Sequence, residues 1–183
     1  MNAVLHPLLT IEDYLAAERV SAVRHEYAGG QVFAMTGASK RHNRICLNAA
    51  MELRAARQPC DIHMADVLVR IEQVFYYPDV MVVCEPNDHP YVETNPCLII
   101  EVLSDSTEGI DRREKLQNYQ RIPHLQAYSL IAQNERRVEV FRRSGGLWAR
   151  EVHSASGMIA LDCPQTMLGL DRVYEGTGVP CLS

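Results

Sequence analysis

The sequence is poor in lysine and has no excess of positive charge. Lys40 and Lys115 are its two lysines, and 18 lysines and arginines stand against 23 aspartates and glutamates, which gives a net charge of -5. A generally basic nucleic-acid-binding surface is therefore excluded, although a local basic groove is not. A lysine with a chemical role must be one of these two residues.

Long apolar runs, internal repeats and low-complexity segments are also absent from the sequence. No apolar stretch reaches the length of a membrane-spanning helix, and residues 1–15 have neither the basic region nor the cleavage site of a secretory signal. With 183 residues and 47% hydrophobic content, the chain is long enough for one compact domain. We therefore expect a single domain over residues 1–183, located in the cytoplasm and not in a membrane.

The six cysteines lack the close spacing of a zinc site or a disulfide framework. The sequence has no Cys-x-x-Cys pair, and several cysteines lie in apolar, strand-like runs such as VMVVCE and PCLIIE. Both observations favour buried, reduced thiols, as found in a reducing cytoplasm. The cysteines are Cys46, Cys60, Cys84, Cys97, Cys163 and Cys181.

Patterns of apolar and turn residues predict both helices and strands. Thr10 followed by Asp13 is typical of a capping box that begins a short helix, and Gly29-Gly30 is typical of a hairpin turn. The expected helices cover residues 39–57 and 104–122, and extended segments are expected within residues 24–35, 60–72, 74–83, 97–103, 125–132, 136–143, 147–153 and 157–161. The predicted fold class is therefore mixed α/β, with a central mixed β-sheet flanked by helices and an N-terminal helix and hairpin.

The helix expected over residues 39–57 has an apolar side that should face the core. Its members are Ile45, Leu47, Ala49, Met51 and Leu53. Packing of this side against the sheet would supply most of the stability of the helix.

Acidic residues interrupt strand-like segments that are otherwise apolar. Glu101 lies in the middle of CLIIEVL, Asp79 follows Pro78 and precedes VMVV, and Glu26 lies in the first strand of the hairpin. A carboxylate in such a strand costs several kcal/mol unless it is paired, protonated or bound to a metal. If the strands of Asp79 and Glu101 are neighbours, their carboxylates approach each other, and a cation between them would relieve the repulsion.

Each of these residues also has a purely structural interpretation. A single glutamate in a sheet more often faces solvent or forms a satisfied ion pair. Lys115, on the helix that follows the Glu101 strand, can point back over the end of that strand, or it can pair with Asp111 four residues earlier. The two acidic strands followed by a lysine favour a metal site, where a cation would also stabilise developing negative charge.

The order of these motifs resembles a known family. HEYAGGQV, His42 on a helix, YPDVMVV, PCLIIEVLSDST, a D-x-x-x-K helix that ends at Lys115, and Tyr119 follow one another. The Pro-Asp and Glu strands are similar to those of the PD-(D/E)XK nuclease superfamily, and the whole order is similar to the Uma-type restriction endonuclease family. The resemblance covers residues 10–175, nearly the whole chain.

The resemblance implies a restriction-endonuclease-like core and a set of site residues. Asp79 and Glu101 would bind Mg²⁺ or Mn²⁺ and activate the attacking water, and Glu26 matches an acidic residue that the early part of the fold adds to the site. The sequence has Leu103 where a strict Glu-x-Lys motif has lysine, which makes Lys115 the candidate catalytic lysine. A second departure, AYSLIAQN, is expected to affect packing or an accessory contact.

Some basic residues are candidates for contacts to phosphate. They flank the proposed acidic site in the sequence, although solvated surface residues would look the same. His42 is equally compatible with a phosphate or metal-bound water contact and with an exposed helix position. The candidates are His42, Lys40, Arg41 and Arg112.

We therefore expect an endonuclease that hydrolyses DNA phosphodiester bonds with Mg²⁺ or Mn²⁺. The alternative is a catalytically silent module that keeps the nuclease fold for binding or interaction, and a third is hydrolysis of RNA or a nucleotide. Duplex cleavage needs two sites, so a homodimer is expected.

Overall fold

The computed structural model describes residues 8–181 of the chain. These residues form three β-sheets and the helices that pack on them. The central sheet has six strands in the order β11-β10-β9-β8-β6-β3. Its strands are β3 (Asp61–Met64), β6 (Val80–Val83), β8 (Leu98–Leu103), β9 (Ala127–Ala132), β10 (Arg137–Ser144) and β11 (Leu147–Ser154). Strands β8 and β9 are parallel and the other pairs are antiparallel, so the expected mixed sheet is confirmed.

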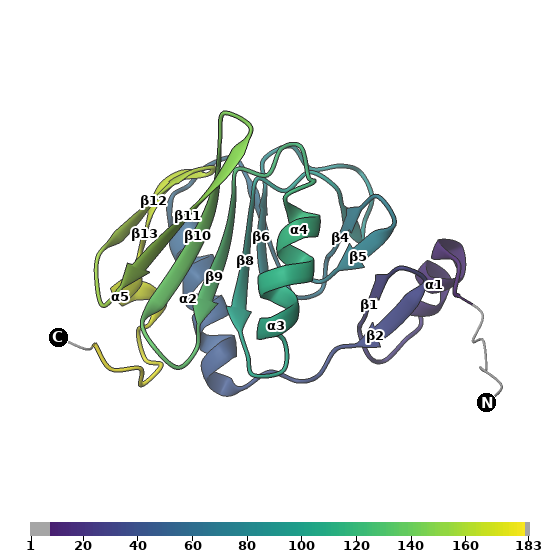
Figure 1. Cartoon of the computed structure of the whole chain (residues 1–183), viewed down its shortest axis with the longest axis horizontal. Coiled ribbons are helices and arrows are strands. Elements are labelled where there is room, and N and C mark those ends of the chain that lie inside the picture. Colours follow the sequence, from purple (N-terminus) through teal and green to yellow (C-terminus); the bar gives the residue numbers. More distant parts are fainter. Residues whose placement is uncertain (1–7, 182–183) are drawn as a thin grey trace.

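Helices cover both faces of the central sheet (Figure 1). Helix α2 (Lys40–Ala55), helix α5 (Leu170–Val173) and the hairpin of β12 (Met158–Asp162) and β13 (Gln165–Gly169) lie on one face. The other face is covered by a continuous helical segment made of α3 (Glu108–Ile110), the π-helix η1 (Asp111–Lys115) and α4 (Leu116–Tyr119). Each face of the central sheet has a hydrophobic core under its helices. Successive side chains of a strand point to opposite faces, so neighbouring residues of a strand belong to different cores.

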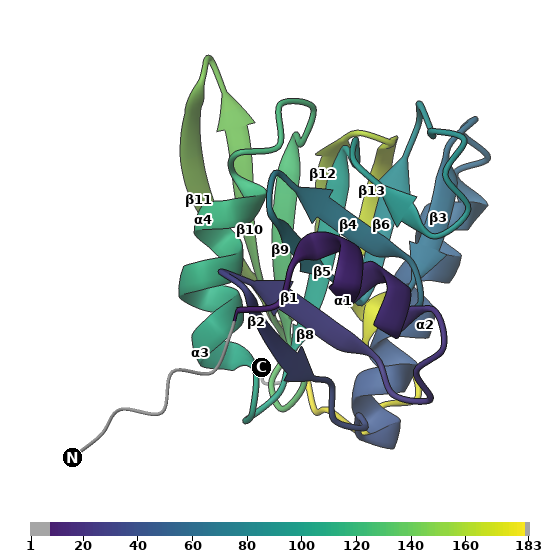
Figure 2. The same ribbon diagram turned by 90° about the vertical axis from the view of Figure 1, so that its right-hand side faces the viewer.

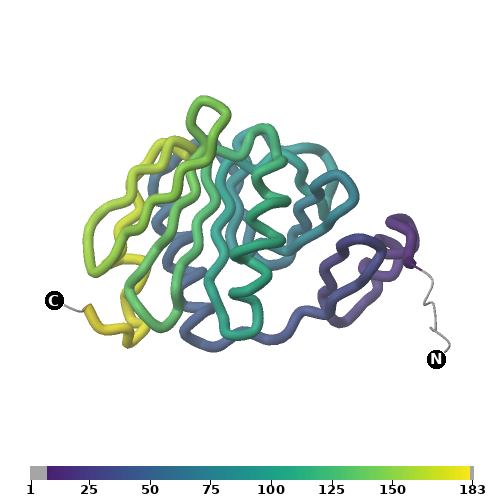
Figure 3. Tube along the Cα trace, in the orientation of Figure 1, coloured from purple at the N-terminus to yellow at the C-terminus, as the bar shows by residue number. Residues whose placement is uncertain are grey.

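A second sheet carries the N-terminal elements. Its five strands follow the order β2-β1-β5-β4-β7, with helix α1 (Ile11–Glu18) packed on it through Tyr14, whose ring lies 4.9 Å from that of Tyr27. The strands are β1 (His25–Ala28), β2 (Gln31–Ala34), β4 (Leu68–Ile71), β5 (Val74–Tyr76) and β7 (Val92–Glu93). Figure 2 shows α1, β1 and β2 lying across the edge of the central sheet, and Figure 3 shows the first and last described segments of the chain on opposite sides of the molecule.

The capping box predicted at Thr10 is confirmed, and a second helix has a similar cap. The Thr10 side chain accepts a hydrogen bond from the Asp13 backbone N–H, and Ser39 caps α2 in the same way through the N–H of His42. Both side chains satisfy N–H groups that have no partner inside the helix.

The expected core side of α2 is only partly correct. Ile45, Ala49 and Leu53 are buried, whereas Leu47 is 42% exposed and Met51 is 61% exposed. A helix repeats every 3.6 residues, so positions four apart share a face and positions two apart do not. Residues 45, 49 and 53 therefore face the sheet, whereas Leu47 and Met51 face solvent.

The prediction of reduced cysteines is wrong for four of the six. Cys60 forms a disulfide with Cys84, and Cys97 forms a disulfide with Cys163. These cysteines are distant in sequence, but Cys60 precedes β3 and Cys84 follows its antiparallel partner β6, so strand pairing brings them together. Cys46 is a buried free thiol, as expected, and Cys181 is an exposed one.

Over the described residues, no helix has both the length and the apolar character needed to cross a membrane.

Candidate active site

Asp79 and Glu101 lie side by side on neighbouring strands. Val80, the first residue of β6, pairs with Ile100 of β8, which puts Asp79 opposite Glu101. The Asp79 backbone N–H donates to Glu101 Oε2 at 3.3 Å, and the Val102 N–H donates to Asp79 Oδ2 at 2.7 Å. The expected pairing of the two acidic strands is therefore confirmed.

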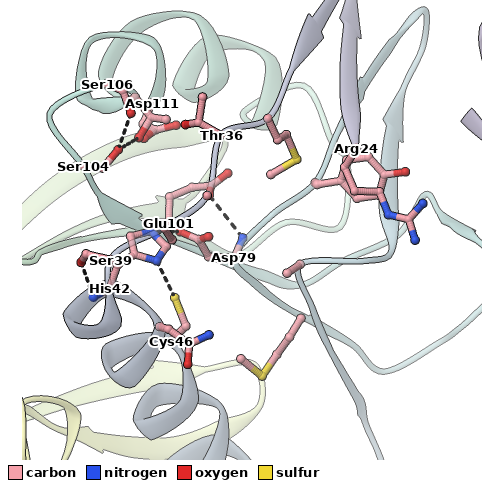
Figure 4. A pocket seen from close by; sticks show the side chains of 18 of the residues that line it. Arg24, Thr36, Ser39, His42, Cys46, Asp79, Glu101, Ser104, Ser106 and Asp111 are labelled. Carbon is pink, nitrogen blue, oxygen red and sulfur yellow. Dashed lines mark hydrogen bonds and ion pairs between the residues drawn. The ribbon is translucent and has the colours of Figure 1, made fainter. Parts of the chain in front are cut away.

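A cavity of about 530 Å³ opens above these two carboxylates. Figure 4 shows Glu101, Asp79 and His42 gathered at its base, with Asp111 beside them and Arg24 toward the far side. Side chains from the β6 and β8 strands, α2 and the helical segment after β8 form its polar lining, which includes Asp79, Glu101, His42, Asp111 and Lys115.

Lys115 is surrounded by carboxylates. Its Nζ lies 2.8 Å from Glu26 Oε1, 3.2 Å from Glu101 Oε1 and 3.5 Å from Asp111 Oδ1, and the residue is 5% exposed. Burial alone would lower the pKa of Lys115, but these carboxylates outweigh burial and raise its pKa well above the ordinary value. Lys115 is therefore positively charged at neutral pH.

The π-helix η1 explains how Lys115 reaches the site. A π-turn widens the helix locally, and such turns occur frequently at functional sites. Asp111 and Lys115 stand at the two ends of η1 and both point inward, whereas the intervening residues are partly or fully exposed. The sequence predicted a helix here but gave no sign of the change in helix type.

The Oε1 atom of Glu101 is held in place by two donors, in addition to the Asp79 backbone N–H that reaches Oε2. Tyr119 donates its hydroxyl to Glu101 Oε1 at 2.8 Å, and Lys115 contacts the same oxygen. Burial raises the pKa of Glu101 well above its ordinary value, Lys115 opposes this, and the charges of Asp111 and Asp79 increase it. The site therefore favours either a proton or a cation at Glu101.

Asp111 is a site residue that the sequence analysis considered only as a partner of Lys115. It is 2% exposed, it lines the cavity, and its buried Oδ1 accepts no hydrogen bond. Burial raises its pKa, and this effect exceeds the opposing influence of Lys115. The D-x-x-x-K spacing was the available signal, because residues four apart share a helix face.

His42 lies inside the site and not on the surface. It is 8% exposed, and its Nε2 lies 3.2 Å from Asp79 Oδ2. Burial alone would lower the pKa of His42, but its hydrogen bond and charge interaction with Asp79 outweigh burial and raise it. His42 therefore holds Asp79 from the side of α2.

Glu26 faces Lys115 and not the cavity. Besides its contact with Lys115 Nζ, Glu26 Oε1 accepts a hydrogen bond from the Tyr77 backbone N–H at 3.2 Å. It is absent from the cavity lining, which includes Glu101 and Asp79. Glu26 is therefore a charge partner of Lys115 and contacts the cavity only through that lysine.

Of the residues considered as phosphate contacts, His42 lines the cavity, whereas Lys40, Arg41 and Arg112 lie outside its lining. Arg112 pairs with Glu108 at 2.6 Å and with Glu139 at 2.7 Å, and Arg41 donates to Asn134 at 2.9 Å. Lys40 is exposed at the first position of α2. Arg24, which was not a candidate, does line the cavity and pairs with Asp66 at 3.2 Å.

The donor set of the site fits a hard divalent cation. Asp79, Glu101 and Asp111 offer carboxylate oxygens, the ligands that Mg²⁺ and Mn²⁺ prefer. Lys115 contacts three carboxylates and cannot neutralise them all, and one buried oxygen of Asp111 lacks a hydrogen bond. A second positive charge would remove this imbalance.

Known proteins are similar to this chain in sequence or in fold. A family model described as "Uma2: Putative restriction endonuclease" matches residues 11–170. Two proteins of Synechocystis sp., both described as uncharacterized, are 33% identical over 177 residues (93% of each chain) and 35% identical over 146 residues (75% of this chain and 82% of the relative). A crystal structure described as a "putative nuclease belonging to DUF820" from Anabaena variabilis has a TM-score of 0.77 at 14% identity and covers 92% of this chain and 99% of its own. This last similarity confirms the expected fold.

Proposed function

The chain belongs to the Uma2 family, described as "Putative restriction endonuclease", and from this premise we propose that it is a metal-dependent endonuclease acting on DNA. The observation that carries the proposal is the buried group of Lys115 with Glu26, Glu101 and Asp111, next to Asp79 in a cavity of about 530 Å³. A group with one lysine among several carboxylates is poorly balanced as a structural ion pair and well suited to hold a cation.

Asp79 and Glu101 would hold Mg²⁺ or Mn²⁺ in this proposal. Such an ion, when bound, supplies a Lewis acid for a phosphate oxygen and lowers the pKa of a bound water. His42 positions Asp79 through Oδ2, and Tyr119 positions Glu101 through Oε1, so both carboxylates are fixed before substrate binds. Preorganisation of this kind avoids a cost of rearrangement during the reaction.

Lys115 would stabilise the negative charge that develops on the phosphoryl group. Its ammonium lines the cavity and touches Glu101, so it lies next to the proposed ligands. Glu26 and Asp111 keep Lys115 protonated and restrict its position. Because Leu103 occupies the usual lysine position of the strand, this helix lysine takes over the role of the missing one.

We further propose that the whole chain acts as one domain on duplex DNA, as a homodimer in the cytoplasm. The dimer follows from the chemistry, since cutting both strands of a duplex needs two sites. Light scattering during gel filtration measures the dimer, and a monomer at working concentration would contradict it.

A second candidate function is a catalytically silent binding module with the same fold. It is favoured by the ion pairs of Arg24 and Arg112 and by the hydrogen bond of Arg41 to Asn134, which leave few free cations near the cavity for phosphates. Calorimetric titration with Mn²⁺ separates the two candidates, because a silent module would show no binding that depends on Asp79.

Cleavage of a supercoiled plasmid with Mg²⁺ or Mn²⁺ tests the proposal. The wild type should nick or linearise the plasmid, chelation should stop it, and Asp79→Asn should remove the activity. Asp61→Asn is the matched control, because Asp61 is an exposed acid on the neighbouring strand β3. Cleavage that survives in Asp79→Asn, or that is equally weak in the control, would overturn the assignment.

A further inference from the structure

Four cysteines meet at the end of the central sheet opposite to the carboxylates. Cys84 follows the last residue of β6, whose other end carries Asp79, and Cys97 precedes the first residue of β8, which carries Glu101. Cys60 precedes β3, and Cys163 lies in the turn between β12 and β13. We call these four residues the cysteine cluster.

The two disulfides of the cysteine cluster lie in contact with each other through their sulfur atoms. Cys84 Sγ is bonded to Cys60 and also lies 3.7 Å from Cys97 Sγ and 3.4 Å from Cys163 Sγ. The sulfurs of Cys84, Cys97 and Cys163 all lie within 4.8 Å of one another. Cys84 therefore touches every other member of the cluster.

This spacing matches the ligand sphere of a thiophilic cation. A Zn–S bond of about 2.3 Å in a tetrahedral site puts neighbouring sulfurs about 3.8 Å apart. Rotation of the Cys60 side chain after reduction would supply the fourth sulfur, because strand pairing holds it opposite Cys84. Ligands from four separate segments would close a structural zinc site of the Cys₄ type.

We propose that the cysteine cluster is a redox-linked site for Zn²⁺. Two equivalents of a dithiol reductant supply four electrons and four protons to the two disulfides, which become four thiols, and each reductant molecule becomes a disulfide. The four thiols bind one Zn²⁺ and release four protons. Two molecules of hydrogen peroxide accept four electrons from the zinc-bound thiolates, form four hydroxide ions, and leave two disulfides and free Zn²⁺.

The surroundings of the cluster suit such a switch. Cys60, Cys84 and Cys163 are half-buried, so small reductants and metal ions reach them, whereas Cys97 is 7% exposed. In either redox state the cluster joins β3, β6, β8 and the β12–β13 turn. The strands that carry Asp79 and Glu101 therefore stay fixed under both reducing and oxidising conditions.

A rival thiophilic site lies inside the candidate active site. Atoms of His42, Cys46 and Asp79 also lie within 4.8 Å of one another. Zinc bound there would depend on Cys46, which belongs to no disulfide. The two sites can therefore be separated by cysteine substitutions.

Zinc content of the full-length protein tests the proposal. The protein is reduced under nitrogen, incubated with Zn²⁺ alone, freed of excess metal and measured by elemental mass spectrometry. About one equivalent of zinc should be retained by the reduced wild type and by Cys46→Ser, and it should be lost from Cys84→Ser, from Cys163→Ser and from the peroxide-treated wild type. Retention by Cys84→Ser with loss from Cys46→Ser, or no retention by the reduced wild type, would overturn the proposal.

Alkylation of the wild type gives a readout that does not depend on the folding of variants. Iodoacetamide should label Cys60, Cys84 and Cys163, the half-buried members of the cluster, in reduced, zinc-free protein and spare them once Zn²⁺ is added. Cys181 is exposed and serves as the internal control, since it should be labelled in both samples. Equal labelling of the cluster with and without Zn²⁺ would contradict the proposal.

Discussion

Two buried glutamates occupy the same row of the central sheet and have opposite surroundings. Glu101 of β8 and Glu139 of β10 both pair in register with Leu130 of β9, and they are 3% and 1% exposed. Glu139 contacts three arginines, Arg112 at 2.7 Å, Arg137 at 3.2 Å and Arg150 at 2.6 Å. Glu101 contacts a single lysine that it shares with two other carboxylates.

The pKa values follow from this difference. Burial alone would raise the pKa of Glu139, but its hydrogen bonds to Arg112 and Arg150 outweigh burial and lower it. At Glu101, burial dominates and raises the pKa, and Lys115 does not compensate. Glu139 is thus a satisfied structural ion pair, whereas Glu101 shares the single positive charge of Lys115 with Glu26 and Asp111. An added cation would therefore be stabilised beside Glu101 and not beside Glu139.

The largest expected effect is on catalysis. Glu101→Gln should lower metal-dependent DNA cleavage by more than about 100-fold, because loss of a charged ligand removes several kcal/mol of transition-state stabilisation. Glu139→Gln, assayed well below its unfolding temperature, should stay within about threefold of the wild type, since Glu139 contacts arginines and does not line the cavity. Equal losses in the two variants would break the distinction between the glutamates.

Removal of the single lysine should have the next largest effect. Lys115→Met keeps the volume of the side chain and leaves three buried carboxylates without their cation, which should cost about 3–5 kcal/mol of unfolding free energy at neutral pH. Urea denaturation measures this loss, and added Mn²⁺ should recover part of it. A variant as stable as the wild type in metal-free buffer would mean that Lys115 does not hold the group together.

The two glutamine variants should differ in the sign of their effect on stability. Glu139→Gln should lose about 1–3 kcal/mol, because strong charged hydrogen bonds are weakened. The loss is moderate because its arginine partners are between 31% and 48% exposed, and water replaces part of the contact. Glu101→Gln should be as stable as the metal-free wild type or more stable, since repulsion is removed. Thermal unfolding in chelator compares them, and a destabilised Glu101→Gln would contradict this.

The smallest expected effect is a dependence on pH. The folded-state pKa of Glu101 lies above its ordinary value of 4.5, so folded protein binds more protons than unfolded protein between these two values. The stability of metal-free wild type relative to Glu101→Gln should therefore be highest below pH 4.5 and fall as pH rises through the folded-state pKa. Urea titrations of both variants at several pH values measure this difference, and Mn²⁺ should abolish it. A difference that grows with pH would have the wrong sign.

The sequence identified Glu101 but could not distinguish it from Glu139. Ile100-Glu101-Val102 and Val138-Glu139-Val140 are the same pattern, an acid between apolar strand residues. What separates them is the set of cations that other elements bring near, and Arg150 and Lys115 reach their partners only through tertiary structure. Local patterns give the element and the face, but not the neighbours.

Contacts that depend on strand pairing also could not be predicted from spacing in the sequence. Asp79 and Glu101 were found because Pro-Asp and apolar-Glu strands are local motifs, and their pairing followed. The disulfide of Cys97 and Cys163 joins residues 66 positions apart, and the register of separate strands and a distant turn decides it. The D-x-x-x-K spacing indicated that Asp111 and Lys115 share a helix face, but the π-helical form of this segment had no signal in the sequence.

The central claim is that the carboxylates around Glu101, and not those around Glu139, bind a divalent cation. Anomalous diffraction from a crystal soaked with Mn²⁺ tests this most directly. We expect a manganese peak between Asp79 and Glu101 and no peak beside Glu139. The peak should be lost in crystals of Glu101→Gln. A crystal soaked to saturation with no peak at Asp79 and Glu101, or with an unchanged peak in Glu101→Gln, would contradict it.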